Sequence, residues 1–303
     1  MSENLLTVDG VTKRFGEFLA LDNISFSIKY GETIGLIGKN GAGKTTLMKT
    51  ILGLYKDFSG KIYYEEKLID HSDPNVMNSI GSLVDCSFYE DMTAYDNLKI
   101  QMMGIKKVKQ AVYKEKIMEL LKFVDLENVY NKKVKSFSFG MKQRLGLVQS
   151  LLSEPKLLIL DEPFVGLDPV GIELLKEKIH YLSNEKKVSI IFSSHQLKEV
   201  EDLCKKILVI GNKKVIYDGL YSELNSNKFY TICLNGSIQD NEIINKIKND
   251  KNLIKEISIK DSCIKFNNIN LLSEILEFCI RNNLKIKDID VQKDSLMQFF
   301  INN

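Results

Sequence analysis

Short stretches of alternating apolar and polar residues dominate the first part of the chain. Residues 5–8 and 23–28 alternate with the period of two that is typical of a half-buried strand, and residues 61–64 do so directly after a Ser59-Gly60 turn. The mostly apolar run at 33–37 lacks this alternation and predicts a strand buried on both faces. We expect the amino-terminal part of the chain to be rich in β-structure.

The period becomes helical between about residues 75 and 150. The apolar residues of 112–124 and of 141–152 recur every three or four positions, so each segment presents one apolar helical face. Beyond residue 150, strands and helices alternate. Apolar runs at 157–160 and 188–192 predict buried parallel strands, and residues 172–182 predict a helix between them. The pattern predicts an α/β core with a helical subdomain inserted at about 75–150.

A polar linker at residues 225–227 precedes a different pattern. From residue 229 onward the predicted order is β-α-β-β-α-β, with strands at 229–234, 254–259, 263–266 and 284–291 and helices at 242–247 and 271–280. This order suggests a small α+β module of the ferredoxin-like, split β-α-β kind. The lysine-rich stretch at 241–252 is read as a solvated helix face. We therefore expect two domains, residues 1–225 and 226–303.

The composition indicates a folded protein that works in the cytoplasm. The 303 residues are 44% hydrophobic and 27% charged, and the net charge of +2 does not by itself indicate a polyanionic partner. The five cysteines are scattered and never spaced as C-x-x-C, which predicts reduced thiols rather than a metal or disulfide framework. We see no signal-like segment at the start and no apolar run near the ~20 residues of a membrane helix. Any membrane role is expected to be peripheral.

Residues 38–45 read GKNGAGKT and fit the phosphate-loop pattern G-x-x-x-x-G-K-[ST]. The loop lies between the predicted buried strand and a helix start. Its glycines let backbone N–H groups turn towards an anion, and the new helix directs its positive dipole end to the same point. The lysine adds charge for the outer phosphates, and the threonine hydroxyl can bind Mg²⁺. The expected triphosphate-binding residues here are Gly38, Lys39, Asn40, Gly41, Ala42, Gly43, Lys44, Thr45 and Thr46.

Two acidic residues directly follow the apolar run at 157–160. An acid just beyond the carboxyl end of a buried parallel strand lies at the usual ligand crevice of such a sheet. We expect Asp161 to hold Mg²⁺, directly or through water, and Glu162 to polarise the attacking water. His195 follows the next buried strand and could contact a phosphate or orient the water. Each residue alone also fits an element that ends at polar surface, but their order around the phosphate loop favours the chemical interpretation.

These motifs, in this order, resemble the nucleotide-binding subunit of ABC transporters over roughly residues 5–225. The resemblance implies a P-loop NTPase core of ABC type, with ATP and Mg²⁺ as cofactors. It implies that Phe15, which could otherwise be a core residue, stacks on adenine. It also implies that Asp168, in the run Gly166-Leu167-Asp168, belongs to a loop that crosses a dimer interface.

The run FSFGMKQR at 137–144 resembles the family's signature motif, LSGGQ followed by a basic-Gln-Arg run. Ser138 is expected to cap the following helix and leave its N-terminal N–H groups open to an anion. In the family this helix end faces ATP held by a partner subunit, so two ATP molecules lie between two chains. The residues concerned are Ser138, Phe139, Gly140 and Met141. Phe139 stands where the motif has its first glycine, and Met141 where it has glutamine.

A second departure from the family pattern is Asp85, which stands where most members carry glutamine. An acid at this position, and the sequence around it, resemble the bacitracin-resistance and lantibiotic-immunity branch. The resemblance implies that Asp85 touches Mg²⁺, and its short side chain could make that contact water-mediated. The alternative is a solvated loop acid without a role in catalysis.

The motifs together predict the ATP-hydrolysing subunit of an efflux-type ABC transporter that exports or clears a peptide antibiotic. The expected partners are a separate transmembrane permease and a second nucleotide-binding subunit, in a homodimer or heterodimer. The expected location is peripheral, on the inner face of the cell membrane.

Two alternatives remain at this point. One is a soluble ABC ATPase that acts on ribosomes or DNA, although a single phosphate loop and the small net charge argue against a nucleic-acid partner. The other is a nucleotide-gated sensor with little turnover, which the altered signature leaves open. The carboxyl-terminal module could regulate the dimer or support pairing.

Overall fold

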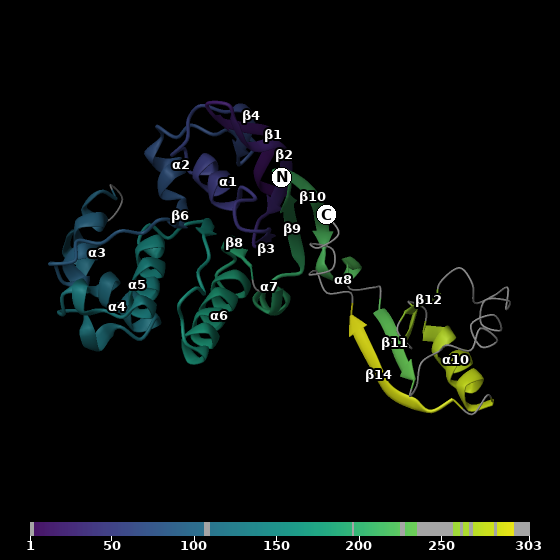
Figure 1. Cartoon of the computed structure of the whole chain (residues 1–303). Coiled ribbons are helices and arrows are strands. Elements are labelled where there is room, and N and C mark those ends of the chain that lie inside the picture. The colour runs from purple at the N-terminus through teal and green to yellow at the C-terminus, as the bar shows by residue number, and fades with distance from the viewer. Residues whose placement is uncertain are drawn as a thin grey trace. The chain divides into compact units, whose positions relative to one another are not determined.

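The computed structural model describes residues 3–105, 110–195, 197–224, 228–234, 257–260, 263–266, 269–281 and 284–293 (Figure 1). The chain divides into two compact units, Met1–Leu220 and Tyr221–Asn303. Each unit has its own hydrophobic core.

A six-stranded sheet forms the centre of the first unit, with strand order β10-β9-β3-β8-β7-β6. The strands β3, β6, β7, β8 and β9 run parallel, and β10 pairs antiparallel with β9. Every residue of β3, β7 and β8 is buried, because elements cover both faces of the sheet. The bounds are β3 (Thr33–Ile37), β6 (Ile80–Leu83), β7 (Leu157–Leu160), β8 (Ser189–Ser194), β9 (Lys206–Gly211) and β10 (Lys214–Leu220).

A second, antiparallel sheet comprises β1 (Asn4–Phe15), β2 (Phe18–Lys29), β4 (Ser59–Tyr64) and β5 (Lys67–Leu68), in the order β2-β1-β4-β5. The strands β1 and β2 are longer than the alternation predicted, since register shifts interrupt the alternation along their pairing. The helix α1 (Lys44–Ile51) contributes apolar side chains to one cluster with both sheets. This cluster holds the helix of the phosphate loop in a fixed position.

The helices α3 (Ala94–Met103), α4 (Tyr113–Phe123) and α5 (Phe139–Leu151) contact one another and gather at one side of the first unit (Figure 1). The short α2 (Pro74–Asn78) and the strand β6 precede them, and β6 pairs with β7 in the central sheet. The expected subdomain boundary near residue 75 was therefore too early. Helical structure of this group begins after β6, whose short run IGSL carries too little pattern to be recognised as a strand.

The helix α7 (Leu197–Leu203) packs against β3 and β8, and α6 (Pro169–Asn184) contacts α7. Close packing requires a glycine beneath α7. A Cβ atom at Gly35 would lie 2.6 Å from a methyl carbon of Val200. The helices α3, α5 and α6 are each preceded by an N-cap residue whose side chain accepts a backbone hydrogen bond, namely Thr93, Ser138 and Asp168.

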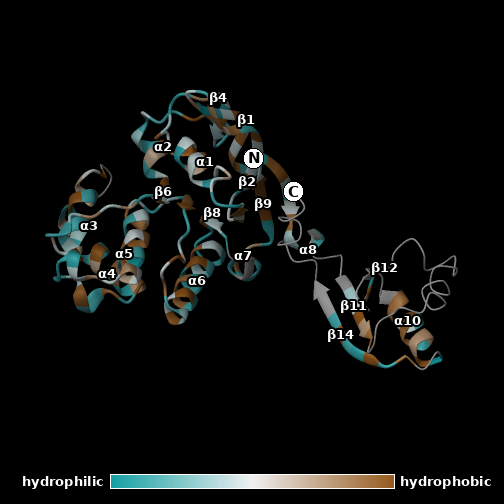
Figure 2. Ribbon diagram, in the orientation of Figure 1, coloured by the Kyte–Doolittle hydropathy of each residue, from teal (hydrophilic) through white to brown (hydrophobic). Residues whose placement is uncertain are grey.

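The second unit is a four-stranded sheet with one described long helix. The bounds are α8 (Tyr221–Leu224), β11 (Lys228–Leu234), β12 (Ile257–Lys260), β13 (Cys263–Phe266), α10 (Ile269–Arg281) and β14 (Ile286–Lys293). The order is β12-β13-β11-β14, and all neighbouring strands are antiparallel, which is the order that two split β-α-β units produce. Apolar residues of α10 pack on one face of this sheet (Figure 2). The linker at 225–227, the helix at 242–247, the lysine-rich stretch at 241–252 and residues 254–256 of one predicted strand lie outside the described residues.

The expectation of five reduced thiols was wrong for one pair. Cys233 and Cys263 lie directly opposite each other on β11 and β13, with 4.1 Å between their Cα atoms, and form a disulfide. Their positions in sequence, 30 residues apart, say nothing of this pairing because the register of the sheet brings them together. Cys86, Cys204 and Cys279 are free thiols.

Candidate functional site

The loop after β3 ends in a segment with two glycines in the left-handed backbone region. Gly41 and Gly43 have φ values of 80° and 112°, which a residue with a Cβ rarely adopts. Gly43 is the N-cap of α1 and supplies no side-chain hydrogen bond to the first turn. The N–H groups of that turn are thus left without a side-chain cap, as an anion-binding helix start requires. The buried Lys44 side chain spans the loop and donates to the carbonyl oxygen of Gly38 over 2.8 Å.

Asp161 lies at the end of β7 and is held by two hydroxyl groups. Thr45 donates to its Oδ2 and Ser193 to its Oδ1, each over 2.6 Å. Among the described residues, no group of three His, Cys, Asp or Glu side chains could hold a metal ion by itself. A hydroxyl and one carboxylate nevertheless fit Mg²⁺, because this ion commonly combines one or two carboxylates with substrate phosphates and water.

Glu162 is the next residue, and three groups fix its position. Its Oε2 lies 2.8 Å from His195 Nδ1, and its Oε1 lies 3.6 Å from Lys44 Nζ. Its backbone N–H donates to the Ser193 hydroxyl over 2.7 Å. The φ of Glu162 is 47°, in the left-handed region that side-chain-bearing residues avoid, so the surrounding contacts hold a strained backbone. The structure brings together Glu162, His195 and Lys44 from separate elements.

Phe15 is the last residue of β1 and presents an exposed ring. It is 43% exposed, and the Tyr55 ring meets it edge-on with centroids 5.0 Å apart. The Lys13 ammonium lies 4.9 Å from the Phe15 centroid. A partly exposed ring supported by a second aromatic residue is suited to stacking on a planar base.

Asp85 lies in the loop after β6 and forms an ion pair with Lys49 of α1. Lys49 is one helical turn beyond Thr45, so the pair links the phosphate-loop helix to the loop after β6. The hydrogen bond that Lys49 donates to the Asp85 carboxylate raises the pKa of Lys49 above its ordinary value. Asp85 has a φ of 48°, so its backbone, like that of Glu162, lies in the left-handed region. The structure therefore gives Asp85 a cationic partner that the sequence did not suggest.

The signature residues form the start of α5. The Ser138 hydroxyl accepts from the backbone N–H of Met141 over 3.2 Å, so the expected cap is present. Phe139 is 56% exposed, and its ring packs against Gly166 in the loop before α6. At the end of that loop, Asp168 accepts from the backbone N–H of Gly171 over 2.9 Å and caps α6. The two segments that the resemblance assigns to a dimer interface thus touch each other within one chain.

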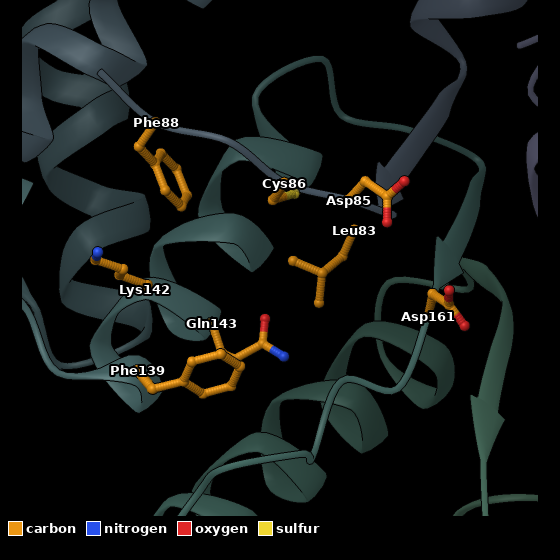
Figure 3. A pocket seen from close by; sticks show the side chains of 8 residues that line it. All are labelled: Leu83, Asp85, Cys86, Phe88, Phe139, Lys142, Gln143 and Asp161. Atoms are coloured by element: carbon orange, nitrogen blue, oxygen red, sulfur yellow. The ribbon is translucent and has the colours of Figure 1, made fainter. Parts of the chain in front are cut away.

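A cavity of about 260 Å³ lies between the loop after β6, the start of α5 and the end of β7 (Figure 3). Asp85 and Cys86 line it from the first segment, Phe139 and Gln143 from the second, and Asp161 from the third. Burial raises the pKa of the Cys86 thiol to about 11, so this cysteine remains protonated near neutral pH. The cavity connects the acid at the strand end with the two unusual positions of the sequence, 85 and 139.

Sequence reasoning missed three residues that hold the side chains of the site in place. Ser193 bridges Asp161 and Glu162, Lys49 pairs with Asp85, and Tyr55 supports the Phe15 ring. The serine could have been found, because it is the last residue but one of a buried parallel strand, close to the carboxyl end at which ligands bind. The lysine and the tyrosine carry no signal, since neither belongs to a recognisable motif.

A phosphate loop with two acids and a histidine at the neighbouring strand ends defines a phosphate-loop ATPase. Residues 21–165 match the family described as ABC transporter. The chain is 32% identical over 306 residues to the bacitracin transport ATP-binding protein BcrA of Bacillus licheniformis, covering 99% of this chain and 97% of the relative. The chain belongs to the ATP-binding proteins of ABC transporters. It binds and hydrolyses ATP as the energy-supplying part of a transport system.

Two further proteins share this similarity. The lantibiotic transport ATP-binding protein SrtF of Streptococcus pyogenes is 40% identical over 222 residues, covering 71% of this chain and 92% of the relative. The solved structure of cbiO1 from Clostridium perfringens, part of the ABC transporter complex cbiONQ, has a TM-score of 0.65 and 27% identity, covering 83% of this chain and 97% of that chain. No helix in the described parts of the chain is long and apolar enough to cross a membrane.

Proposed function

We propose that this ATPase powers the export or clearance of a peptide antibiotic, of the bacitracin kind, through a separate membrane permease. The observation that carries this proposal is the extent of the similarity to the bacitracin transport protein, which includes 99% of the chain. The similarity to the lantibiotic transport protein stops at 71% and leaves part of the chain unmatched. The protein then lies peripherally on the inner face of the membrane, bound to its permease.

The proposed roles in ATP hydrolysis follow the geometry of the site. The loop 38–46 binds the phosphates through backbone N–H groups and Lys44, and Phe15 stacks on the adenine. Thr45 and Asp161 would hold Mg²⁺, which would neutralise charge on the phosphates when bound. Glu162 accepts a proton from the attacking water, and His195, at hydrogen-bond distance from Glu162, orients both.

We further propose that the active form is a dimer, with a second copy or a similar subunit. Ser138 and Gly140 at the start of α5 would meet the ATP of the partner chain, and Met141 and Asp168 would lie at the same interface. Two observations support this arrangement. The α5 start is capped by a short serine side chain and remains accessible, and Phe139 exposes 56% of its surface there.

The proposal is tested by purifying the chain from cells that also express the candidate permease. We expect a membrane protein to co-purify, ATP hydrolysis to depend on an intact Glu162, and bacitracin resistance of the host to rise. A lantibiotic and an antibiotic without peptide character serve as matched comparisons for substrate class. Co-purification of ribosomes or DNA would favour the alternative soluble ATPase, and tight ATP binding without turnover in the permease complex would favour a sensor.

Replacing Asp85 by alanine should affect coupling more than nucleotide binding. The ion pair with Lys49 is partly exposed, so its loss should change ATP affinity by no more than ~5-fold. Resistance conferred by the complete transporter should fall much further, because Asp85 joins the phosphate-loop helix to the cavity beside α5. The measurements are nucleotide affinity by fluorescence titration and resistance in growing cells. Asp91→Ala, which removes another exposed ion pair, is the control. Unchanged resistance in the Asp85 variant would contradict a role of Asp85 in coupling.

A further inference from the structure

The ring of Phe139 lies directly against the backbone of Gly166. A Cβ atom at Gly166 would lie 2.7 Å from Cε1 of Phe139, well inside a normal contact between carbon atoms. Gly166 also has a φ of 73°, in the left-handed region. Glycine therefore suits this position for two reasons: the backbone conformation favours a residue without a Cβ atom, and the Phe139 ring leaves little room for one.

Two further contacts join the same two segments. A Cβ atom at Gly140 would lie 3.0 Å from Cδ2 of Leu167, so the helix start and the loop are closely packed there. The side-chain amide of Gln143 donates to the carbonyl oxygen of Glu162 over 3.4 Å. The first turns of α5 thus contact both ends of the loop that begins at Glu162 and ends at the cap of α6.

The backbone of this loop carries Glu162, the proposed base. Glu162 has a φ of 47°, and its carboxylate must remain 2.8 Å from His195. A strained residue keeps its conformation only where neighbouring contacts hold it. The contact of Phe139 with Gly166 is the apolar part of that support, and a residue without a side chain at position 139 could not supply it.

We propose that Phe139 is a positioning residue: its ring holds the loop 162–168 against α5 and keeps Glu162 in its working position. This inference rests on the proposed role of Glu162 in hydrolysis. In this role Phe139 acts through its contact with the loop of its own chain.

The test is a double-mutant cycle in the full-length chain, with Phe139→Ala, Gly166→Ala and the double variant. Phe139→Ala should lower kcat by about tenfold or more and leave KM for ATP and nucleotide binding unchanged, because misplacement of a catalytic group affects the reaction rather than binding. Phe139→Leu should restore most of the rate. Gly166→Ala should cost much more activity with the ring present than in the Phe139→Ala background, where only the backbone strain remains.

A second measurement does not depend on activity. Hydrogen exchange of the backbone N–H groups of residues 164–168 in the nucleotide-free chain should become faster in Phe139→Ala and stay unchanged in Tyr89→Ala, which removes another exposed aromatic side chain. An unchanged kcat in Phe139→Ala, or an equal cost of Gly166→Ala in both backgrounds, would overturn the inference. If the chain without substitutions failed to bind ATP, the proposed function would be overturned instead.

Discussion

Replacing Glu162 by glutamine is expected to lower ATP hydrolysis by about 10²–10⁴-fold and to leave ATP binding intact. Glutamine has nearly the same shape as glutamate but cannot accept a proton at neutral pH. ATP should therefore remain bound, and ATP-containing dimers should accumulate. Steady-state phosphate release measures the first effect, and size-exclusion chromatography with ATP measures the second.

The geometry around Glu162 explains why the effect should be large. One carboxylate oxygen is paired with His195, which follows β8, and the other lies 3.6 Å from Lys44 of the phosphate loop, so both oxygens are directed by partners. The Ser193 hydroxyl links the Glu162 backbone to Asp161, which ties the proposed base to the proposed cation site. A shift of the carboxylate, as in Glu162→Asp, should also be costly for this reason.

Glu65→Gln is the matched control, because Glu65 forms an ion pair with Lys156 away from the site. It should retain full turnover. Full turnover in Glu162→Gln would exclude Glu162 as the base. Glu199 would then be the next acid to test, since it accepts a hydrogen bond from Ser194 beside His195, and burial raises its pKa above the ordinary value.

The elements of the fold that could be predicted are those marked by a pattern of apolar and polar residues along the sequence itself. The buried strand at 157–160 agrees residue for residue with the structure, because four apolar residues in a row require cover on both faces. The strand β6 has no such signal and was placed in the helical subdomain. The Cys233–Cys263 disulfide depends on strand register, which the sequence does not encode locally.

The same division holds for the candidate site. The phosphate loop was recognisable because its donors are consecutive residues of one turn. The contacts of Asp161 with Thr45 and Ser193 could be expected in outline, since parallel strands end at one edge of the sheet. The pairs Asp85–Lys49 and Phe139–Gly166 join segments without a shared motif, so only the folded chain reveals them.

Lys44→Ala is expected to weaken ATP binding by roughly 10- to 100-fold, because hydrogen bonds to charged groups contribute about 1.5–3 kcal/mol. Lys44 is 6% exposed, and its ammonium bonds the Gly38 carbonyl at the opposite end of the loop. Its loss removes both the charge that meets the phosphates and the contact that closes the loop. Nucleotide affinity by fluorescence titration is the measurement, and thermal unfolding of the free protein reports whether the variant is folded.

Lys39→Ala distinguishes this role from a general effect of positive charge. Lys39 lies in the same loop, but its side chain is exposed and its carbonyl oxygen accepts from the backbone N–H of Ala42. If charge near the loop were sufficient, both variants would lose similar affinity. We expect Lys39→Ala to lose far less, because Lys44, unlike Lys39, is buried within hydrogen-bond reach of the loop backbone. Equal losses of ATP affinity in the two variants would contradict this role of Lys44. They would show that the contact of Lys44 with Gly38, which closes the loop, does not determine ATP binding.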